Sequence, residues 1–466
     1  MEGLEISEVS NLALERTVRL DSEFYKKENL ITLDLLKRHE VLNLTEITKV
    51  SDGNHNAISE KFQDTGIPYY RGQDVSSFFV ENAKPMCIDD DTFHLPVMKR
   101  SHLKKGDVLL SIVGTIGKLS LVYSDKQATC SCKLAILRPF DVSAEFLAIF
   151  LESKYGQNQI KKFTRGAVQM GLILEDANQI FIPQLSKSFQ QQIEDLVKSA
   201  HSTQERSKSL YQESENFLLS ELGIDESVFK VSKNEVITNT KTFADFENSW
   251  RLDAEYYQPK YERLISKIQS QPHQTLGSIV NIVKSIEPGS EAYQTTGIPF
   301  VRISNMTKFG LSEPDIHLDN EAFNFPFLMP KKDTILLTKD GTVGTAYKVE
   351  KDSYFITSGA ILHLTITDKK VLPDFLTLIL NSTLTKLQSE RDAGGSIIQH
   401  WKPSEIEQVI IPILPMDFQQ IIIEKIQGSF SLKTKSEQLL SLAKRAVEIA
   451  IEEGEDAAVA WVRGHE

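Results

Sequence analysis

The stretch Arg19-Leu-Asp-Ser-Glu-Phe-Tyr25 returns 232 residues later as Arg251-Leu-Asp-Ala-Glu-Tyr-Tyr257. Four further landmarks return in the same order, at offsets between 227 and 231 residues. The earlier copies are Thr65-Gly-Ile-Pro-Tyr-Tyr-Arg71, Gly114-Thr-Ile-Gly117, Phe146-Leu-Ala-Ile-Phe-Leu-Glu-Ser153, and Ile182-Pro183 with Phe189-Gln-Gln191; the later copies are Thr296-Gly-Ile-Pro-Phe-Val-Arg302, Gly341-Thr-Val-Gly344, Phe375-Leu-Thr-Leu-Ile-Leu-Asn-Ser382, and Ile411-Pro412 with Phe418-Gln-Gln420. A unit of this length is too long for a solenoid repeat and long enough for a domain with a connecting element. The sequence therefore predicts two related halves with a pseudo-twofold character.

The composition is that of an ordinary globular protein. The chain has 466 residues, 41% hydrophobic and 25% charged, which gives room for several cores. It has no apolar run of membrane-spanning length, and its first ten residues are acidic, so neither a transmembrane span nor a secretory signal is expected. The cysteines, Cys87, Cys130 and Cys132, lie in the first half without counterparts in the second. This unrepeated set predicts reduced thiols in a cytoplasmic protein, and Cys130-Ser-Cys132 lacks a partner pair at zinc-finger spacing.

The net charge of −12, from 52 basic and 64 acidic residues, limits what the chain can bind by long-range attraction. A protein with this balance gains little steering towards a polyanion. Contact with a nucleic acid would therefore depend on local basic patches or on a positively charged partner subunit.

Each half is predicted to be a mixed α+β domain. The apolar run Val108–Val113, the turn Gly114–Gly117 and the segment Leu119–Tyr123 predict a β-hairpin, and residues 334–349 repeat the pattern. An amphipathic helix around residues 146–151 or 375–380 follows. A glycine-bearing loop (165–166 or 393–395) and a short strand ending in Ile-Pro then close each domain.

A long helix is expected after each Ile-Pro. The apolar positions of the first helix lie three or four residues apart over roughly thirty residues, interrupted by Thr203, Ser207, Ser214 and Glu221. They are Phe189, Ile193, Leu196, Ala200, Leu210 and Phe217; the second helix offers Ile422, Leu432, Leu439, Ala443, Ala446 and Ala450. This spacing predicts two long helices that pair with each other as a coiled coil.

Motifs of the common catalytic sites are incomplete in this sequence. Gly114-Thr-Ile-Gly117-Lys118 has two residues between the glycines where a phosphate loop has four, and Leu119 replaces the hydroxyl residue. Asn324-Phe-Pro-Phe327 lacks the second proline of the adenine methyltransferase box. The repeated carboxylates, Asp21 with Glu23 and Asp253 with Glu255, stand beside arginines at helix starts, which favours capping or ion pairing. We expect a non-catalytic chain without a cofactor or metal of its own.

The repeated motifs resemble the specificity (S) subunits of type I restriction–modification systems over essentially the whole chain. Asp52-Gly-Asn-His55 followed by Gly66-Ile-Pro-Tyr-Tyr-Arg71 is similar to the opening of the family's target recognition domain. Gly106-Asp-Val-Leu-Leu110 with the Gly114 turn resembles its middle signature, and Ile411-Pro-Ile-Leu-Pro415 with Phe418-Gln-Gln420 the start of its conserved helices. The second half lacks the Asp-Gly-x-His segment, and Gln184-Leu185 replaces the expected second proline of the first half.

The resemblance implies an α+β chain with two target recognition domains separated by an antiparallel pair of conserved helices. The expected parts are target recognition domain 1 (1–185), a central conserved helix (186–222), a linker (223–245), target recognition domain 2 (246–412) and a C-terminal conserved helix (413–455). It also implies double-stranded DNA and two methyltransferase (M) subunits as partners, with or without a restriction (R) subunit. S-adenosylmethionine, ATP and magnesium are then expected on those partner subunits, with no membrane association.

The loops between the landmarks barely align: Asp74–Phe79 of the first half corresponds to Asn305–Phe309 of the second. One frame with different loops predicts two different half-sites, hence an asymmetric bipartite DNA target. A helix of about 33 residues spans roughly 50 Å, enough to hold two readers a turn of duplex or more apart.

Candidate DNA contacts are basic or amide side chains close to these loops. Arg71 and Arg302 end equivalent strands. An arginine at this position can contact a phosphate, form two hydrogen bonds to guanine, or donate hydrogen bonds to carbonyl oxygens of its own loop. Basic clusters are solvated surface or phosphate contacts. The basic candidates are Arg71, Lys99, Arg100, Lys104, Lys105, Lys118, Lys161, Lys162, Arg165, Arg302, Lys331 and Lys332; Gln73, Ser304 and Asn305 are candidates for reading base edges.

Two other functions compete with a DNA reader. A protein adaptor with twofold pseudosymmetry would use its repeats to bind proteins alone, and the acidic net charge favours this alternative. A self-sufficient methyltransferase is disfavoured by the incomplete catalytic motifs.

Overall fold

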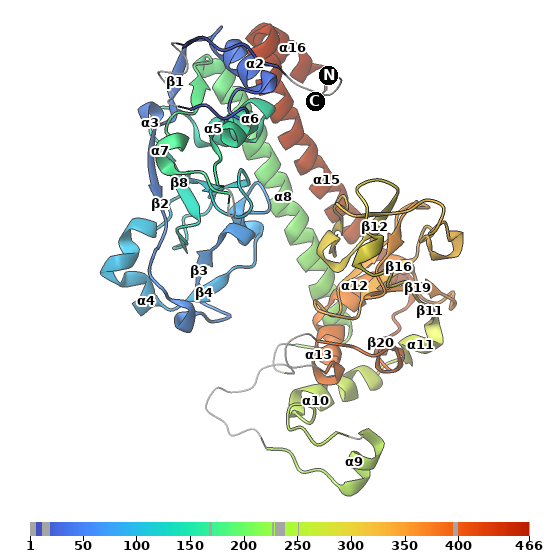
Figure 1. Cartoon of the computed structure of the whole chain (residues 1–466). Helices are drawn as coiled ribbons and strands as arrows, with labels where there is room; N and C mark the ends of the chain where they lie inside the picture. The colour runs from blue at the N-terminus through green and yellow to red at the C-terminus, as the bar shows by residue number, and fades with distance from the viewer. Residues whose placement is uncertain are drawn as a thin grey trace. The chain divides into compact units, whose positions relative to one another are not determined.

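The computed structural model describes residues 6–11, 19–166, 170–225, 228, 238–249, 251–394 and 399–465. The chain is a mixed helix-and-strand protein that divides into two compact units (Figure 1). Unit 1 comprises Met1–Glu205 with Lys433–Glu466, and unit 2 comprises Arg206–Leu432. The two long helices, α8 (Lys187–Glu221) and α15 (Met416–Glu453), contribute residues to both units.

Besides its parts of α8 and α15, unit 1 is built from short strands and helices. They are α2 (Lys27–Leu36), β1 (Val41–Asn43), α3 (Leu44–Ile47), β2 (Thr48–Asp52), η1 (Ser59–Lys61), β3 (Ile67–Tyr70), η2 (Gly72–Asp74), η3 (Val80–Asn82), β4 (Met86–Ile88), α4 (Asp90–His94), η4 (Pro96–Ser101), β5 (Val108–Ser111), β6 (Leu119–Leu121), β7 (Thr129–Cys130), β8 (Leu134–Pro139), α5 (Ala144–Glu152), α6 (Lys154–Phe163), α7 (Leu174–Ala177), β9 (Phe181–Pro183) and α16 (Glu455–Arg463). An antiparallel four-stranded sheet has the order β2-β8-β5-β6, and a three-stranded sheet has the order β4-β3-β7 with β3 and β7 parallel. A separate antiparallel pair, β1-β9, places Leu42 opposite Ile182.

Unit 2 has an equivalent set of elements. They are α9 (Phe243–Ser249), α10 (Pro259–Gln269), β10 (His273–Thr275), α11 (Leu276–Ile279), β11 (Val280–Lys284), η6 (Ser290–Ala292), β12 (Ile298–Val301), η7 (Ile303–Asn305), β13 (Met306–Thr307), β14 (Gly310–Leu311), β15 (His317–Leu318), η8 (Pro326–Leu328), β16 (Ile335–Thr338), β17 (Ala346–Lys348), β18 (Ile356–Thr357), β19 (Ile361–Ile366), α12 (Pro373–Asn381), α13 (Thr383–Asp392), α14 (Pro403–Glu407) and β20 (Ile410–Pro412). Its sheets have the orders β11-β19-β16-β17, β15-β12-β18 and β10-β20, so they follow the connectivity of unit 1 strand for strand. The pair β13-β14 is an addition.

The helix that the sequence predicts to be amphipathic is instead buried on every side in each unit. Every residue from Phe146 to Leu151 in α5, and from Phe375 to Leu380 in α12, is buried. A helix without a polar face must be covered on every side. Each lies in one continuous core with its four-stranded sheet and with residues of α8 and α15. The Ser143 hydroxyl accepts the Phe146 N–H at the start of α5, whereas Pro373 occupies the first turn of α12.

Within each unit, the parts of α8 and α15 pack against each other through small residues. In unit 1 the Ser436 hydroxyl donates to the Ala200 carbonyl oxygen at 2.7 Å. In unit 2 the hydroxyls of Ser207 and Ser429 each donate to the other's carbonyl oxygen, both at 2.7 Å. Small side chains allow this close approach, and the bonds satisfy hydroxyls that are buried.

In unit 2 the expected contact stripe of α8 faces α15. Leu210 Cδ1 would lie 3.5 Å from a Cβ at Gly428, and the rings of Phe217 and Phe418 have centroids 6.1 Å apart. The adjacent Tyr211 and Leu218 are buried in the core of unit 2 instead. The expected linker at 223–245 and the loop glycine at 395 lie partly or wholly outside the described residues. Among the described helices, none has the length and apolar character needed to cross a bilayer.

Candidate nucleic-acid interface

The hairpin turn of the four-stranded sheet is a glycine-bounded loop in both units. Gly114 and Gly117 have φ values of +84° and +86°, and Gly341 and Gly344 have +67° and +85°. This left-handed region is open to glycine and strained for other residues, so the repeated glycines are required by the turn itself. Strands β5 and β6 pair directly on either side of the first turn, and β16 and β17 on either side of the second, as the sequence predicts.

Three segments of unit 1 that are distant in sequence meet at the Gly114 turn. The Thr115 hydroxyl donates to the Gly72 carbonyl oxygen at 3.2 Å, which joins the turn to η2. The Leu172 N–H donates to the Ile112 carbonyl oxygen at 2.9 Å, which joins it to the loop that follows α6. That loop is closed by a reciprocal backbone pair between Arg165 and Gly171, at 2.8 and 2.7 Å.

Sequence-predicted residues lie on all three segments of unit 1. Arg71 precedes η2, Gln73 lies within it, Lys118 ends the Gly114 turn, and Arg165 opens the loop; all but half-buried Arg71 are exposed. These four polar side chains come from three separate parts of the chain and belong to one local cluster of loops. We name this cluster the loop face of unit 1.

The arginines of the loop face are held by carboxylates. The Nε of Arg71 lies 3.3 Å from Asp74 Oδ2, and Asp74 also accepts the Arg71 backbone N–H at 2.8 Å. Arg165 contacts both carboxylate oxygens of buried Asp176, with Nε–Oδ2 at 2.5 Å. Both guanidinium groups are thereby oriented while part of each remains accessible.

Unit 2 brings the equivalent segments together. The Gly341 N–H donates to the Gln399 carbonyl oxygen at 2.9 Å, and Gly394 and His400 form the reciprocal backbone pair. A methyl group of Ile303 in η7 would lie 3.8 Å from a Cβ at Gly341, so η7 borders this turn. Arg302, with Nη2 at 3.0 Å from Asp315 Oδ1, and exposed Ser304 lie here. We name this cluster the loop face of unit 2.

Asn305 does not suit the base-reading role that the sequence suggested. It is 8% exposed, and its side-chain oxygen accepts the Arg302 backbone N–H at 3.0 Å. This bond matches the one that Asp74 makes in unit 1, so Asn305 closes the turn. The amide type alone could not separate a turn-closing residue from a reader.

Lys162 does not suit a phosphate contact. It is 7% exposed, and its Nζ lies 4.2 Å from the centroid of the Phe24 ring. Burial lowers the pKa of Lys162 to about 8. Its neighbour Lys161 is exposed on the same helix. Adjacent helical positions point in different directions, which a run of two lysines does not reveal.

The remaining basic candidates lie outside the loop faces. Exposed Lys99 and Arg100 lie on η4, and Arg100 contacts the Asp52 carboxylate. Lys104 and Lys105 follow η4 and are exposed, with Lys105 Nζ 5.3 Å from the Tyr123 ring centroid. In unit 2, exposed Lys331 and Lys332 precede β16; Lys331 Nζ lies 3.7 Å from Asp352.

Two aspartate–histidine pairs were missed by the sequence reasoning. Asp52 Oδ2 lies 2.6 Å from His55 Nε2, and the other oxygen of the same carboxylate contacts the Arg100 guanidinium. Asp340 lies 2.8 Å from His400. Burial opposes ionisation of Asp340, but bonds from Lys339 and His400 prevail and lower its pKa. His55 stood in a quoted motif, whereas His400 is far from Asp340 in sequence and gave no signal.

The described residues include no group of three or more histidine, cysteine, aspartate or glutamate side chains placed to hold a metal ion. Cys87, Cys130 and Cys132 are free thiols. Cys130 lies on β7, and burial raises its pKa. What both loop faces offer is an array of oriented hydrogen-bond donors on rigid turns, suited to recognition.

Residues 273–441 match the family model described as the type I restriction modification DNA specificity domain. Among solved structures, the chain is similar to a type I restriction–modification S subunit from M. genitalium (14% identity, 91% of this chain and 95% of that chain, TM-score 0.36). It is also similar to the HsdS subunit from Thermoanaerobacter tengcongensis (15%, 89% and 97%, 0.29) and to the type IIG restriction endonuclease BpuSI (10%, 41% and 30%, 0.30). A comparison with curated proteins gave no match. The family match at 273–441 confirms the resemblance to type I specificity subunits.

Proposed function

We propose that this chain, which carries a type I restriction–modification DNA specificity domain at residues 273–441, is the DNA sequence-specificity subunit of a type I restriction–modification complex. The match to that domain is the observation that carries the proposal. The loop face of unit 2, from Arg302 to His400, lies wholly inside the matched residues. In this proposal the chain itself is non-catalytic and reads the sequence on which partner subunits act.

We further propose that the target is bipartite and asymmetric. The two loop faces share their glycine turns and strand connectivity but not their side chains. Unit 1 presents Gln73 and Arg165, whereas unit 2 presents Ser304 and His400 around an equivalent turn. Different donors and acceptors on one frame favour different base edges. Arg71 and Arg302 are the proposed direct contacts of the two half-sites.

The proposed domain plan keeps the sequence boundaries. Target recognition domains at 1–185 and 246–412 are joined by conserved helices at 186–222 and 413–455, with a linker at 223–245. The contacts between α8 and α15 inside each unit support an antiparallel coiled coil. Because α8 has 35 residues, it is about 52 Å long, and we propose that this length sets the separation of the half-sites.

Two methyltransferase subunits are the proposed partners, with or without a restriction subunit. Matching surfaces on two related units can each bind one copy of the same protein, which is the simplest use of a pseudo-twofold chain. The methyl donor, ATP and magnesium would then be bound by those partners. A cytoplasmic location follows from this role.

The direct test is methylation of duplex DNA in the presence of S-adenosylmethionine. The chain alone is expected to give no product, and addition of its methyltransferase subunit is expected to methylate two adenines at a fixed separation. Sequencing of modified bases in the host genome identifies the methylated site. Deletion of the gene that encodes this chain should remove methylation at that site. Methylation by the chain alone, or identical sequences in the two half-sites, would contradict the proposal.

Variants assign each half-site to a unit. Arg71→Ala is expected to relax recognition in one half-site and Arg302→Ala in the other, each at a cost of about 1–3 kcal/mol in binding. Lys369→Ala, a change of an exposed lysine between β19 and α12 that is not among the candidate contacts, serves as the control. A chain that binds methyltransferase but has no affinity for any duplex would instead support the adaptor alternative.

A further inference from the structure

The repeated Arg-Leu-Asp motif forms the same turn in both units. In residues 19–25 the Arg19 guanidinium donates to both carboxylate oxygens of Asp21, at 2.7 and 2.9 Å. In residues 251–257 the Arg251 guanidinium does the same to Asp253, at 2.6 and 2.7 Å. The bond from arginine lowers the pKa of each aspartate. We call these segments the Arg-Leu-Asp turns.

Aromatic residues fix each turn further. The Arg19 guanidinium carbon lies 4.6 Å from the Phe24 ring centroid, and that of Arg251 lies 5.0 Å from the Tyr256 centroid. The next residue packs edge-on in both cases, with centroids 5.0 Å apart and interplanar angles of 77° and 84°. The arginine, the aspartate and both aromatic residues of each motif thus hold the turn in one conformation.

The leucine of each motif takes no part in this packing. Leu20 is 86% exposed and Leu252 is 83% exposed. A single exposed leucine needs no explanation, but the same leucine exposed at both copies of a matched, rigid turn does. The turn itself requires the arginine and aspartate on either side, whereas any residue would serve at the leucine position.

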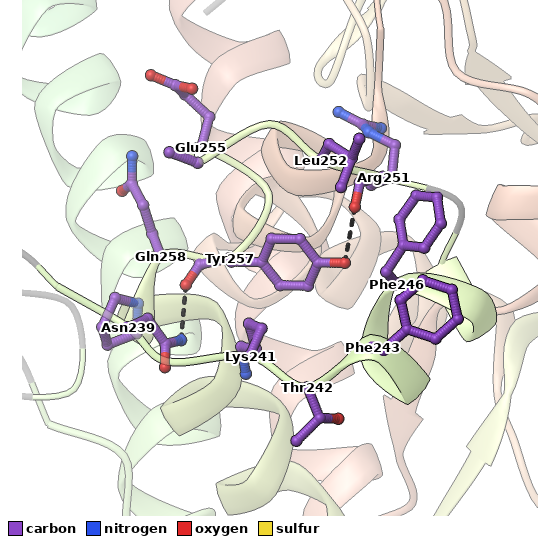
Figure 2. A pocket seen from close by; sticks show the side chains of 12 residues that line it. Asn239, Lys241, Thr242, Phe243, Phe246, Arg251, Leu252, Glu255, Tyr257 and Gln258 are labelled. Atoms are coloured by element: carbon purple, nitrogen blue, oxygen red, sulfur yellow. Dashed lines mark hydrogen bonds between the residues drawn. The ribbon is translucent and has the colours of Figure 1, made fainter.

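The surroundings of the two leucines indicate what kind of molecule meets them. Beside each leucine the arginine and the aspartate neutralise each other, Arg19 with Asp21 and Arg251 with Asp253. The exposed carboxylates of Glu23 and Glu255 follow on the same turns, so the turns attract a phosphate backbone little. Leu252 lines a cavity of about 700 Å³ whose other side chains are a mixture of aromatic, polar and charged groups (Figure 2). Its lining includes Phe243, Phe246 and Tyr257, with the Tyr257 hydroxyl donating to the Arg251 carbonyl oxygen at 2.9 Å.

We propose that Leu20 and Leu252 are the anchors by which two copies of one protein partner dock, one on each Arg-Leu-Asp turn. The partner surface is an apolar pocket for the leucine with basic side chains at its rim, complementary to the exposed carboxylates of Glu23 and Glu255. Equal geometry at the two turns calls for the same partner twice, and the rigid turn presents the anchor without an ordering cost. This inference rests on the proposed function, under which the partner is the methyltransferase subunit.

Binding stoichiometry tests the inference. The full-length chain and its methyltransferase subunit are mixed, and the mass of the complex is measured by light scattering after size exclusion. The variants are Leu20→Ser, Leu252→Ser and the double substitution. Ile31→Ser in unit 1 and Phe327→Ser in unit 2 are matched controls, because both side chains are exposed but lie outside the turns. All five variants should unfold at the wild-type temperature.

The wild type and both controls are expected to bind two methyltransferase copies. Each single anchor variant should keep one copy and bind the second at least tenfold more weakly, and the double variant should lose both. If the anchor variants bind two copies as the wild type does, the docking inference is wrong while the proposed function stands. If the wild type binds DNA but no methyltransferase, both the inference and the proposed partner are refuted.

Discussion

Lys162 offers a sharp test because two lines of reasoning about it give opposite results. As a phosphate contact, its loss would weaken DNA binding. In the structure its ammonium group lies between aromatic rings, 4.2 Å from the centroid of Phe24 and 5.7 Å from that of Phe163. Burial, with smaller contributions from Lys37 and Arg19, lowers its pKa to about 8 from the ordinary 10.5.

The size of the effect follows from that pKa. Holding the ammonium charged in this site at neutral pH costs the folded state on the order of 3 kcal/mol. The cation–π contact with Phe24 offsets about 1–2 kcal/mol of that cost. Lys162→Met keeps the apolar stem and removes the charge, so we expect it to raise the free energy of unfolding by about 1–2 kcal/mol at pH 7.

Urea unfolding at about pH 7 and about pH 9.5 is the assay. An unfolded lysine keeps its ordinary pKa, so the unfolded state binds more protons between about pH 8 and 10.5, and the wild type gains stability as the pH rises through that window. The advantage of the methionine variant should therefore shrink at the higher pH. DNA affinity should be unchanged in Lys162→Met, whereas the exposed neighbour tested as Lys161→Met should show weaker binding and a smaller salt dependence if it contacts phosphate. A variant less stable than wild type at pH 7, or with reduced DNA affinity, would refute the reasoning.

Three further predictions concern stability. Burial lowers the pKa of His363 to about 4, so the unfolding free energy should fall, by on the order of 3 kcal/mol, as the pH drops from about 6.5 to 4, and His363→Gln should flatten that profile. Gly114→Ala should lower the free energy of unfolding by about 1 kcal/mol, because the glycine has a positive φ. Gly117→Ala should lower it further, because there the new Cβ would also lie 2.8 Å from a side-chain oxygen; urea midpoints compare the two variants. Arg138→Met should cost about 3–5 kcal/mol in the same assay, because it strips the buried Asp107 carboxylate of two bonds of 2.6 Å.

The local parts of the fold could be predicted because their signals are local. A glycine pair between apolar runs predicts a hairpin, and the pairs β5-β6 and β16-β17 confirm it. The sequence also predicts the helices α5 and α12, but as amphipathic helices, whereas residues 146–151 and 375–380 are buried on all sides. The repeat also predicted which elements correspond between halves. What could not be predicted was which of two adjacent residues is exposed, as with Lys161 and Lys162 on α6. Which of two adjacent residues is exposed depends on the segment that packs against the helix, and the periodicity of one helix does not contain that information.

The candidate site shows the same division. Sequence reasoning found Arg71, Arg165 and Arg302 because each stands beside a repeated glycine or strand landmark. Sequence reasoning could not place these arginines beside the glycine turns, because the hydrogen bonds that join their segments to the turns run between residues tens of positions apart. Asp340 and His400 were missed for this reason, since their pairing exists only after the turn and the loop have met.

The carboxylate partners of the arginines reconcile an acidic chain with a DNA-reading role. Arg71, Arg100, Arg165 and Arg302 each contact an aspartate, so their charge is largely neutralised before any DNA arrives. Such arginines contribute little to non-specific attraction, which depends on unneutralised charge, but their fixed orientation suits bidentate bonds to one base. On the proposed function the chain alone should therefore bind non-specific duplex weakly, with a small salt dependence, and most phosphate contacts should come from the methyltransferase. A steep salt dependence for the isolated chain would contradict this division of labour, because it would place the phosphate contacts here.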